Sequence, residues 1–314
     1  MATSKVAFVF PGQGSQYVGM GKDLCERFVA AKRIFAEADD ALGYSLSKLC
    51  FNGPDLELKR TEITQPAILT ASIAALRVLE SETPLRADFV AGHSLGEYSA
   101  LVCAAAFSFV DAVKIVGQRG RFMQEAVPAG EGGMAVILGL DMDKVRLLCA
   151  EASGGEVVAP ASYNGGGQIV IAGAKRAVAR ATVLAKERGA KRVLDLPVSA
   201  PFHCELMRPA AERLNQALAS IVVNSLSVGV VTNVEAEVNQ DAGRVKSLLT
   251  EQAVRPVRWE ESVRKLAALG CQRVLEVGPG KVLSGLIKRI SSCLDTENFE
   301  SAQDLARMRG ETAG

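Results

Sequence analysis

The sequence predicts an α/β protein in which a mostly parallel, helix-covered sheet carries a smaller inserted module. Apolar runs typical of buried strands alternate with segments of helical spacing. Between about Pro128 and Pro197 the order becomes strand, helix, strand, strand, helix, strand, which is the ferredoxin-like βαββαβ pattern. The length of 314 residues accommodates one large domain with a smaller one attached.

The elements of the larger unit follow from local patterns. Residues 63–82 have helical spacing with Pro66 near the first turn, and a second helix opens with a capping box at Ser108-x-x-Asp111. Short apolar runs predict the strands KVAFVF (5–10), DFVAG (88–92), GVVTNV (229–234) and RVLEVGPG (273–280).

The inserted module has six predicted elements, and a Gly165–Gly167 turn joins its two central strands. In chain order these are a strand at 132–140, a helix at 141–153, strands at 157–164 and 168–173, a helix at 174–189 and a strand at 190–197. From about Ser291 the sequence is polar and weakly patterned, which predicts a fraying tail or a loose helix.

Composition and charge exclude several classes of function. The net charge of +1 gives no global field for nucleic acid or an anionic membrane. No apolar stretch reaches the ~18 residues of a membrane span, and a Pro-Gly-Gln-Gly turn ends the first apolar run too early for a signal peptide. Seven scattered cysteines, no CxxC pair and only two histidines are typical of free thiols in a reducing cytosol. We therefore expect a cytoplasmic protein with no metal site.

Gly92-His93-Ser94-Leu95-Gly96 fits the G-x-S-x-G nucleophile elbow. The motif alone is weak, but a predicted strand precedes it and a predicted helix follows, as the elbow requires. These neighbours favour Ser94 as a nucleophile over a small residue at a structural turn.

A serine nucleophile needs a base, and the chain has only two histidines. His93 is adjacent to Ser94, where neighbouring side chains diverge, so His203 is the favoured base. No acid stands out as a third member, since Glu205 is too close in sequence. A backbone carbonyl could hold the imidazole instead.

The loop after the first strand, Gly12-Gln13-Gly14, lacks the ending of a phosphate-binding Walker loop. It could point backbone N–H groups into a site, in which case Gln13 and Leu95 fit the two donors of an oxyanion hole. An ordinary strand-to-helix turn explains the loop equally well.

Charged residues offer two further candidates. Arg119 lies at the edge of a helical apolar stripe, so it is either a surface arginine or an anchor for a substrate carboxylate. A possible basic rim consists of Lys191, Arg192, Lys281, Lys288 and Arg289, although exposed, solvated charge is the ordinary explanation for all five.

These motifs together resemble the malonyl-CoA:acyl carrier protein transacylases, the acyl-loading enzymes of bacterial-type fatty acid synthesis. The matching segments keep the family's order and spacing: FVFPGQGSQ, TQPA, GHSLGEYSALVCA, QRGRFMQEAVP, VIAG, LPVSAPFH, TNV and EVGPGK. The resemblance implies an α/β-hydrolase-like core (1–127 and 198–290), a ferredoxin-like insert (128–197) and a polar tail (291–314).

The resemblance also implies roles for individual residues. Ser94 matches the nucleophile and His203 the base. Gln13 and Leu95 match the oxyanion-hole donors, and Arg119 matches the arginine that binds the malonyl carboxylate.

Four more positions match with other roles. The main-chain carbonyl of Gln252 matches the group that orients the histidine, and His93 and Asn164 match supporting positions. Phe202 stands where several single-domain members carry a small residue and where malonyl-selective polyketide acyltransferases carry Phe. A ring there would exclude a branch methyl, with a finite selectivity of about 1–3 kcal/mol.

The expected activity is a ping-pong transfer from malonyl-CoA to the phosphopantetheine thiol of holo acyl carrier protein, through a malonyl-serine. We expect a monomer with no cofactor of its own, and the basic rim as the carrier-protein contact. Fatty acid synthesis is the expected pathway, with polyketide synthesis as the alternative. A serine esterase or thioesterase, or a non-catalytic docking subunit, are the rival interpretations.

Overall fold

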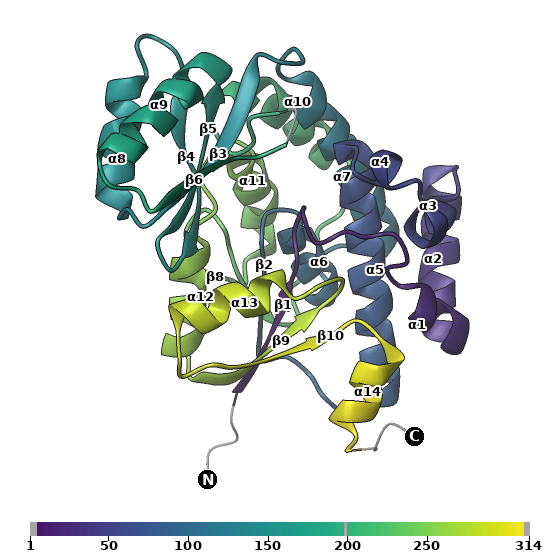
Figure 1. The fold of residues 1–314 in the computed structure, drawn as a ribbon. Coiled ribbons are helices and arrows are strands. Elements are labelled where there is room, and N and C mark those ends of the chain that lie inside the picture. Colours follow the sequence, from purple (N-terminus) through teal and green to yellow (C-terminus); the bar gives the residue numbers. More distant parts are fainter. Residues whose placement is uncertain (1–4, 198–199, 311–314) are drawn as a thin grey trace.

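The structure, a computed structural model, describes residues 5–197 and 200–310 and contains two β-sheets (Figure 1). One is six-stranded and mainly parallel, and the other is four-stranded and antiparallel. This confirms the α/β class, with a mainly parallel sheet and a separate smaller one. Within the described residues, no helix combines the length and the apolar character that crossing a membrane demands.

The larger sheet has the strand order β10-β9-β1-β2-β7-β8, and only the pairing of β7 with β8 is antiparallel. Parallel neighbours need long crossovers, which bring helices onto both faces. The strands are β1 (Lys5–Phe10), β2 (Phe89–Gly92), β7 (Gly229–Val231), β8 (Val238–Asn239), β9 (Cys271–Val277) and β10 (Asp295–Phe299).

Side chains of β1 alternate between two cores, as the period of a strand requires. Phe8 and Phe10 pack into the larger core, together with α5 (Thr61–Glu82), α6 (Gly96–Cys103) and α7 (Phe109–Glu125). Ala7 and Val9 pack on the other face against α12 (Trp259–Ala268) and α13 (Val282–Ile290). The sheet is therefore buried on both sides.

The smaller sheet has the order β4-β5-β3-β6, with every pairing antiparallel. Its two helices pack on one face, and its other face is directed toward the larger unit. The predicted βαββαβ order is present, as β3 (Gly132–Leu138), α8 (Met142–Ala152), β4 (Val158–Gly165), β5 (Gln168–Ala174), α9 (Lys175–Glu187) and β6 (Arg192–Asp195).

Several helices complete the molecule without having been predicted. They are α1 (Lys22–Arg27), α2 (Val29–Leu42), α3 (Leu46–Asn52), α4 (Asp55–Leu58), a 3-10 turn (Glu205–Met207), α10 (Arg208–Ala219) and α11 (Ala242–Gln252), together with α12 given above. The last helix, α14 (Ala302–Met308), lies in the segment where a loose helix was one of the two expectations.

The prediction of a fraying tail or a loose helix from about Ser291 is wrong for the part that forms β10, and only the short helix α14 corresponds to it. Strand β10 pairs in parallel with β9 along five residues and forms the edge of the larger sheet. Phe299 is fully buried, and Ser301 caps α14 with a capping box. Tertiary pairing orders a segment whose own pattern is weak. The predicted boundary at 198 and the ends of the predicted units at 1–4 and 311–314 lie outside the described residues.

Candidate active site

The G-x-S-x-G segment forms a sharp turn between β2 and α6, as its context predicted. A Cβ on Gly92 would lie 2.0 Å from the backbone of Gly96, and one on Gly96 would lie 2.0 Å from the carbonyl oxygen of Phe10. Both positions therefore require glycine. Ser94 adopts φ +51°, a left-handed conformation that costs a non-glycine residue energy.

The imidazole of His203 lies against Ser94. Its Nε2 is 2.7 Å from Ser94 Oγ, and its Nδ1 is 2.7 Å from the main-chain oxygen of Gln252. A carbonyl only accepts, so Nδ1 carries the proton and Nε2 is free to accept from the serine hydroxyl. Glu205 instead pairs with Arg208 at the surface. A backbone carbonyl thus occupies the place that an acid fills in other triads.

The environment of His203 keeps it neutral. Burial, together with the nearby charge of Arg119, lowers the pKa of His203 to about 3, against the opposing hydrogen bond to Gln252. A neutral imidazole is the form that can accept a proton from a hydroxyl.

Arg119 is buried, with 1% of its surface exposed, so the surface-arginine alternative is wrong. Its Nη1 donates to Gln65 Oε1 at 2.8 Å, and its Nη2 donates to Gln252 Oε1 at 2.9 Å and to Ser94 Oγ at 3.1 Å. Burial lowers its pKa. Among the residues that the structure describes, no acid forms an ion pair with it. A desolvated guanidinium with neutral acceptors is suited to receiving an anion beside the serine.

Gln13 and Leu95 line the same cavity as Ser94, Arg119 and His203, with a volume of about 270 Å³. The loop that carries Gln13 rests on the elbow, because a Cβ at the preceding glycine would lie 2.3 Å from the carbonyl oxygen of residue 93. This places both predicted donor residues beside the nucleophile. Their role as an oxyanion hole stays a prediction.

The remaining predicted residues also lie at this site. His93 directs its Nε2 to Asn164 Oδ1 at 2.8 Å and to Ser162 Oγ at 3.1 Å, so it connects the elbow with β4 of the smaller sheet. Burial lowers the pKa of His93. Phe202 is nearly buried and lines the cavity wall.

Three functional-site residues were given no role by sequence reasoning: Gln65, Glu97 and Asn233. Asn233 Oδ1 accepts from the Ser94 N–H at 2.6 Å, and its Nδ2 donates to the Gly92 oxygen at 2.6 Å. Glu97 Oε2 accepts from Gln252 Nε2 at 2.8 Å and from the Asn233 N–H at 3.0 Å. All three lie within the motifs TQPA, GHSLGEYS and TNV, which was the available signal.

Sheet topology explains why these segments meet. Gln13 follows β1, Ser94 follows β2 and Asn233 follows β7, and these three strands are neighbours in one parallel sheet. Loops at the carboxyl ends of parallel strands converge on a common crevice. The face of the smaller sheet and helix α13 form the other walls, through Val136, Val170, Leu283 and Leu286.

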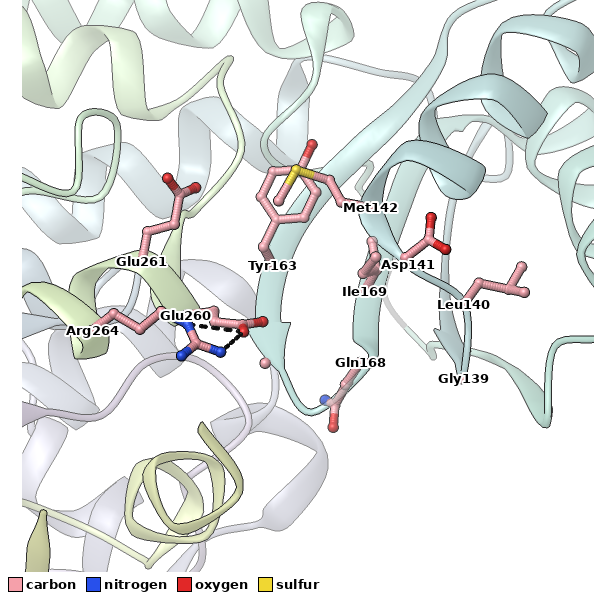
Figure 2. Close-up of a pocket in the computed structure, with 12 residues that line it drawn as sticks. Gly139, Leu140, Asp141, Met142, Tyr163, Gln168, Ile169, Glu260, Glu261 and Arg264 are labelled. Atoms are coloured by element: carbon pink, nitrogen blue, oxygen red, sulfur yellow. Dashed lines mark hydrogen bonds and ion pairs between the residues drawn. The ribbon is translucent and has the colours of Figure 1, made fainter. Parts of the chain in front are cut away.

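A second, larger cavity of about 580 Å³ lies between the turn of β4 and β5 and helix α12 (Figure 2). Figure 2 shows Glu260 and Arg264 of α12 paired with each other, opposite the strands that carry Tyr163 and Gln168. This cavity contains neither Ser94 nor His203. Cavity size therefore does not identify the candidate active site. The smaller cavity is the candidate because Ser94, His203 and Arg119 line it.

The five residues of the basic rim are all exposed. The side chain of Lys191 packs over Gly139, and that of Arg289 over Gly166, while Gly167 lies against Gly139. These contacts bring Lys191 and Arg289 to the same corner of the molecule.

The acyl transferase domain family model matches residues 7–314 of the chain. The malonyl CoA-acyl carrier protein transacylase of Escherichia coli (strain K12) is 50% identical over 303 residues, which are 96% of this chain and 98% of that protein. The enzyme of the same name from Bacillus subtilis (strain 168) is 52% identical over 294 residues, 93% of this chain and 92% of its own.

Solved structures are similar over nearly the whole chain. An acyl carrier protein S-malonyltransferase from Vibrio cholerae superposes with a TM-score of 0.95 at 48% identity, covering 97% of this chain and 100% of that one. A malonyl-transacylase in complex with a type II PKS acyl-carrier protein gives a TM-score of 0.95 at 45% identity, covering 98% and 100%.

Proposed function

This chain belongs to the acyl transferase domain family, and on this premise we propose that it transfers malonyl groups from malonyl-CoA to acyl carrier protein through Ser94. The observation that carries the proposal is the contact of Ser94 Oγ with both the His203 imidazole and the Arg119 guanidinium. A nucleophile, its base and a buried cation within one crevice suit an acyl group that ends in a carboxylate.

In the first half-reaction, His203 Nε2 takes the proton of Ser94 as the oxygen attacks the thioester carbon. The N–H groups of Leu95 and Gln13 receive the developing oxyanion, and each such donor contributes roughly 10²–10³ in rate in comparable enzymes. The C–S bond then breaks, and coenzyme A leaves with the proton from His203. Malonyl-Ser94 remains as the covalent intermediate.

In the second half-reaction, the phosphopantetheine thiol of the carrier protein occupies the position of coenzyme A. His203 removes the thiol proton, sulfur attacks the ester carbon, and the proton returns to Ser94 Oγ as the C–O bond breaks. These steps use only side chains and backbone groups of this chain, and the phosphopantetheine arrives on the partner.

Two side chains would select the acyl group. Arg119 would bind the malonyl carboxylate through two N–H groups, which orients the carbonyl toward Ser94. Phe202 on the cavity wall would exclude a methyl branch beside that carboxylate, at about 1–3 kcal/mol. His93 and Asn164 would hold the elbow against β4.

The carrier protein would dock on the basic rim. Arg289 Nη2 lies 3.5 Å from Gln168 Oε1, and Gln168 lines the catalytic cavity. Lys281 directly precedes α13, whose first residues also line it. An acidic carrier face on this rim would place its phosphopantetheine arm at the cavity mouth.

We further infer the finer organisation from the same premise. The unit with the parallel sheet corresponds to an α/β-hydrolase-like core, with residues 128–197 as a ferredoxin-like insert. The enzyme would act as a cytoplasmic monomer and supply extender units for fatty acid synthesis, with a polyketide carrier as the alternative acceptor.

Intact-mass analysis after mixing with malonyl-CoA tests the central step. The wild-type protein should gain one malonyl group and lose it on addition of holo carrier protein, whereas Ser94→Ala should gain none. Release of free malonate without formation of malonyl-carrier protein would identify a thioesterase instead. An unmodified wild-type protein would refute the serine mechanism.

A further inference from the structure

Gln252 connects the base to the proposed anion site. Its main-chain oxygen accepts from His203 Nδ1 at 2.7 Å, and its side-chain Oε1 accepts from Arg119 Nη2 at 2.9 Å. The side chain is fully buried. The position of this one residue therefore fixes the orientation of both the His203 ring and the Arg119 guanidinium.

The orientation of the Gln252 amide depends on two close acceptors. Its Nε2 donates to the Ser94 oxygen at 3.0 Å and to Glu97 Oε2 at 2.8 Å, with Asn233 Oδ1 farther away at 3.5 Å. A reversed amide would place its NH₂ group against the Arg119 guanidinium and its oxygen against two acceptors. Glu97 is the nearest acceptor of this amide, and therefore the side chain that most directly enforces the observed orientation.

Glu97 also holds the elbow through Asn233. The same Oε2 atom accepts from the Asn233 N–H at 3.0 Å. The Asn233 side chain in turn bonds to the Ser94 N–H and the Gly92 oxygen. One buried carboxylate thus supports the turn that displays the nucleophile and the residue that orients its base.

We propose that Glu97 is a positioning residue: as a hydrogen-bond acceptor it fixes Gln252 and Asn233, and so keeps His203 and Arg119 directed at Ser94. This inference rests on the proposed function, since it concerns how that site is held for malonyl transfer. Glu97 touches neither substrate nor the reacting atoms.

The role requires an acceptor and not a negative charge. Burial raises the pKa of Glu97 to about 7, opposed by the hydrogen bonds from Gln252 and Asn233 and by the charge of Arg119. The other titratable group beside it is Tyr98, the next residue along α6. A carboxyl oxygen accepts whether or not the group is ionised, so a glutamine at position 97 should preserve the network.

The test compares acylation of Ser94 by malonyl-CoA and by acetyl-CoA in single turnovers. Glu97→Ala should lower the malonyl preference about tenfold, within the coupling measured for residues of one hydrogen-bond network. Glu97→Gln should keep the preference near that of the wild type. In a background of Gln252→Met, which keeps the main-chain carbonyl but loses the amide, Glu97→Ala should have little further effect on the preference.

Equal defects in Glu97→Gln and Glu97→Ala, or additive effects of Glu97→Ala and Gln252→Met, would overturn the inference. If the alanine variant does not fold, Glu97→Asp replaces it in the comparison with Gln252→Met, because its shorter side chain moves the acceptor away by one methylene. Glu276→Ala is the matched control, because Glu276 is a fully buried carboxylate that accepts from the N–H groups of Leu283 and Ser284.

The Glu276→Ala control should slow both acylations in parallel and leave the malonyl preference unchanged. An equal loss of preference in this control would show that any buried glutamate has the effect, and would refute the assignment. The proposed function fails separately, because wild-type protein that is not acylated by malonyl-CoA refutes it before any variant is compared.

Discussion

Ser94 and His203 share a left-handed backbone conformation, with φ of +51° and +61°. Each such residue costs on the order of 1–3 kcal/mol and persists only where its surroundings enforce it. Asn233 bonds the Ser94 N–H, and Gln252 bonds the His203 ring. The side chains of Ser94 and His203 are therefore positioned by an unusual backbone conformation, which the Asn233 side chain and the Gln252 main-chain carbonyl help to maintain.

Removal of the buried cation should separate charged from uncharged acyl groups. Arg119→Ala should reduce acylation by malonyl-CoA by roughly a hundredfold or more, since truncating one member of a buried charge pair costs several kcal/mol. Acetyl-CoA makes no such pair, so its relative rate should rise. Single-turnover acylation with both thioesters measures this. Arg121→Ala, an exposed arginine on the same helix, is the control, and equal losses for both thioesters would refute the anchor.

The acylation rate should not follow the titration of an ordinary histidine. The pKa of His203 is lowered from 6.5 to about 3, so the imidazole stays neutral as the pH falls through the usual histidine range. Acylation by malonyl-CoA should therefore show no inflection near pH 6.5. The pKa of Glu97 is raised to about 7, but its proposed role needs an acceptor oxygen and not a charge, so the wild type and Glu97→Gln should show the same pH profile. Single-turnover acylation rates between about pH 5 and pH 8 test this prediction. A fall in rate centred near pH 6.5 that is also seen in Glu97→Gln would contradict it.

At the residue scale, the sequence predicts those site residues that stand in a recognisable motif or belong to a rare residue type. Ser94 stands in an elbow pattern, and His203 is the one other histidine besides His93. Glu97 lies within the GHSLGEYS motif, but nothing there indicates its role, because a glutamate on a helix is ordinarily exposed. Its burial depends on α7 and α11 bringing Arg119 and Gln252 against it.

At the scale of elements, the loop after β1 is held by a glycine that permits close approach. A Cβ at Gly12 would lie 2.3 Å from the His93 oxygen, so Gly12→Ala must push the Gln13 loop away from the elbow. A shift of about 1 Å at a reacting centre can cost about a hundredfold in rate. Malonyl and acetyl acylation should fall by the same factor, because an oxyanion donor does not distinguish acyl groups.

The matched control for this loop is Gly117→Ala on α7, where the nearest atom to an added Cβ is a leucine methyl at 3.8 Å. Its acylation rates should stay close to those of the wild type. A Gly12→Ala variant as active as Gly117→Ala would remove the loop from the mechanism.

Elements with strong local patterns were predictable, and those ordered by partners were not. β1 and the insert strands have apolar runs. α7 begins at Phe109 with Ser108 as its N-cap, as predicted, and the Ser108 side chain accepts from the Asp111 N–H. β10 reads DTENF, without an apolar face, and becomes a strand only beside β9. The helix predicted from residue 63 begins earlier, at Thr61, which leaves Pro66 inside it instead of in its first turn.

At the scale of the whole molecule, the site is assembled where the two sheets face each other. Ser94, His203 and Arg119 belong to the unit of the larger sheet, while Val136 and Val170 of the smaller sheet line the opposite wall of the cavity. The bond from His93 to Asn164 crosses between them. Such a junction depends on long-range packing, so the sequence predicted the two units but not the contacts that join them.

The same junction places the basic rim on both units, because Lys191 directly precedes β6 of the smaller sheet and Arg289 lies on α13 of the larger unit. If an acidic carrier face docks there, Lys191→Glu combined with Arg289→Glu should slow malonyl transfer to holo carrier protein about tenfold at low salt. The defect should shrink as salt rises, because exposed charges are screened over about 8 Å at physiological ionic strength. Transfer to free pantetheine, which has no charge to dock, should be unaffected. Arg33→Glu is the control, because Arg33 is exposed and its helix, α2, lies away from α13 in Figure 1. This variant should leave both transfers unchanged. Equal slowing with carrier protein and pantetheine would instead indicate damage to the cavity itself.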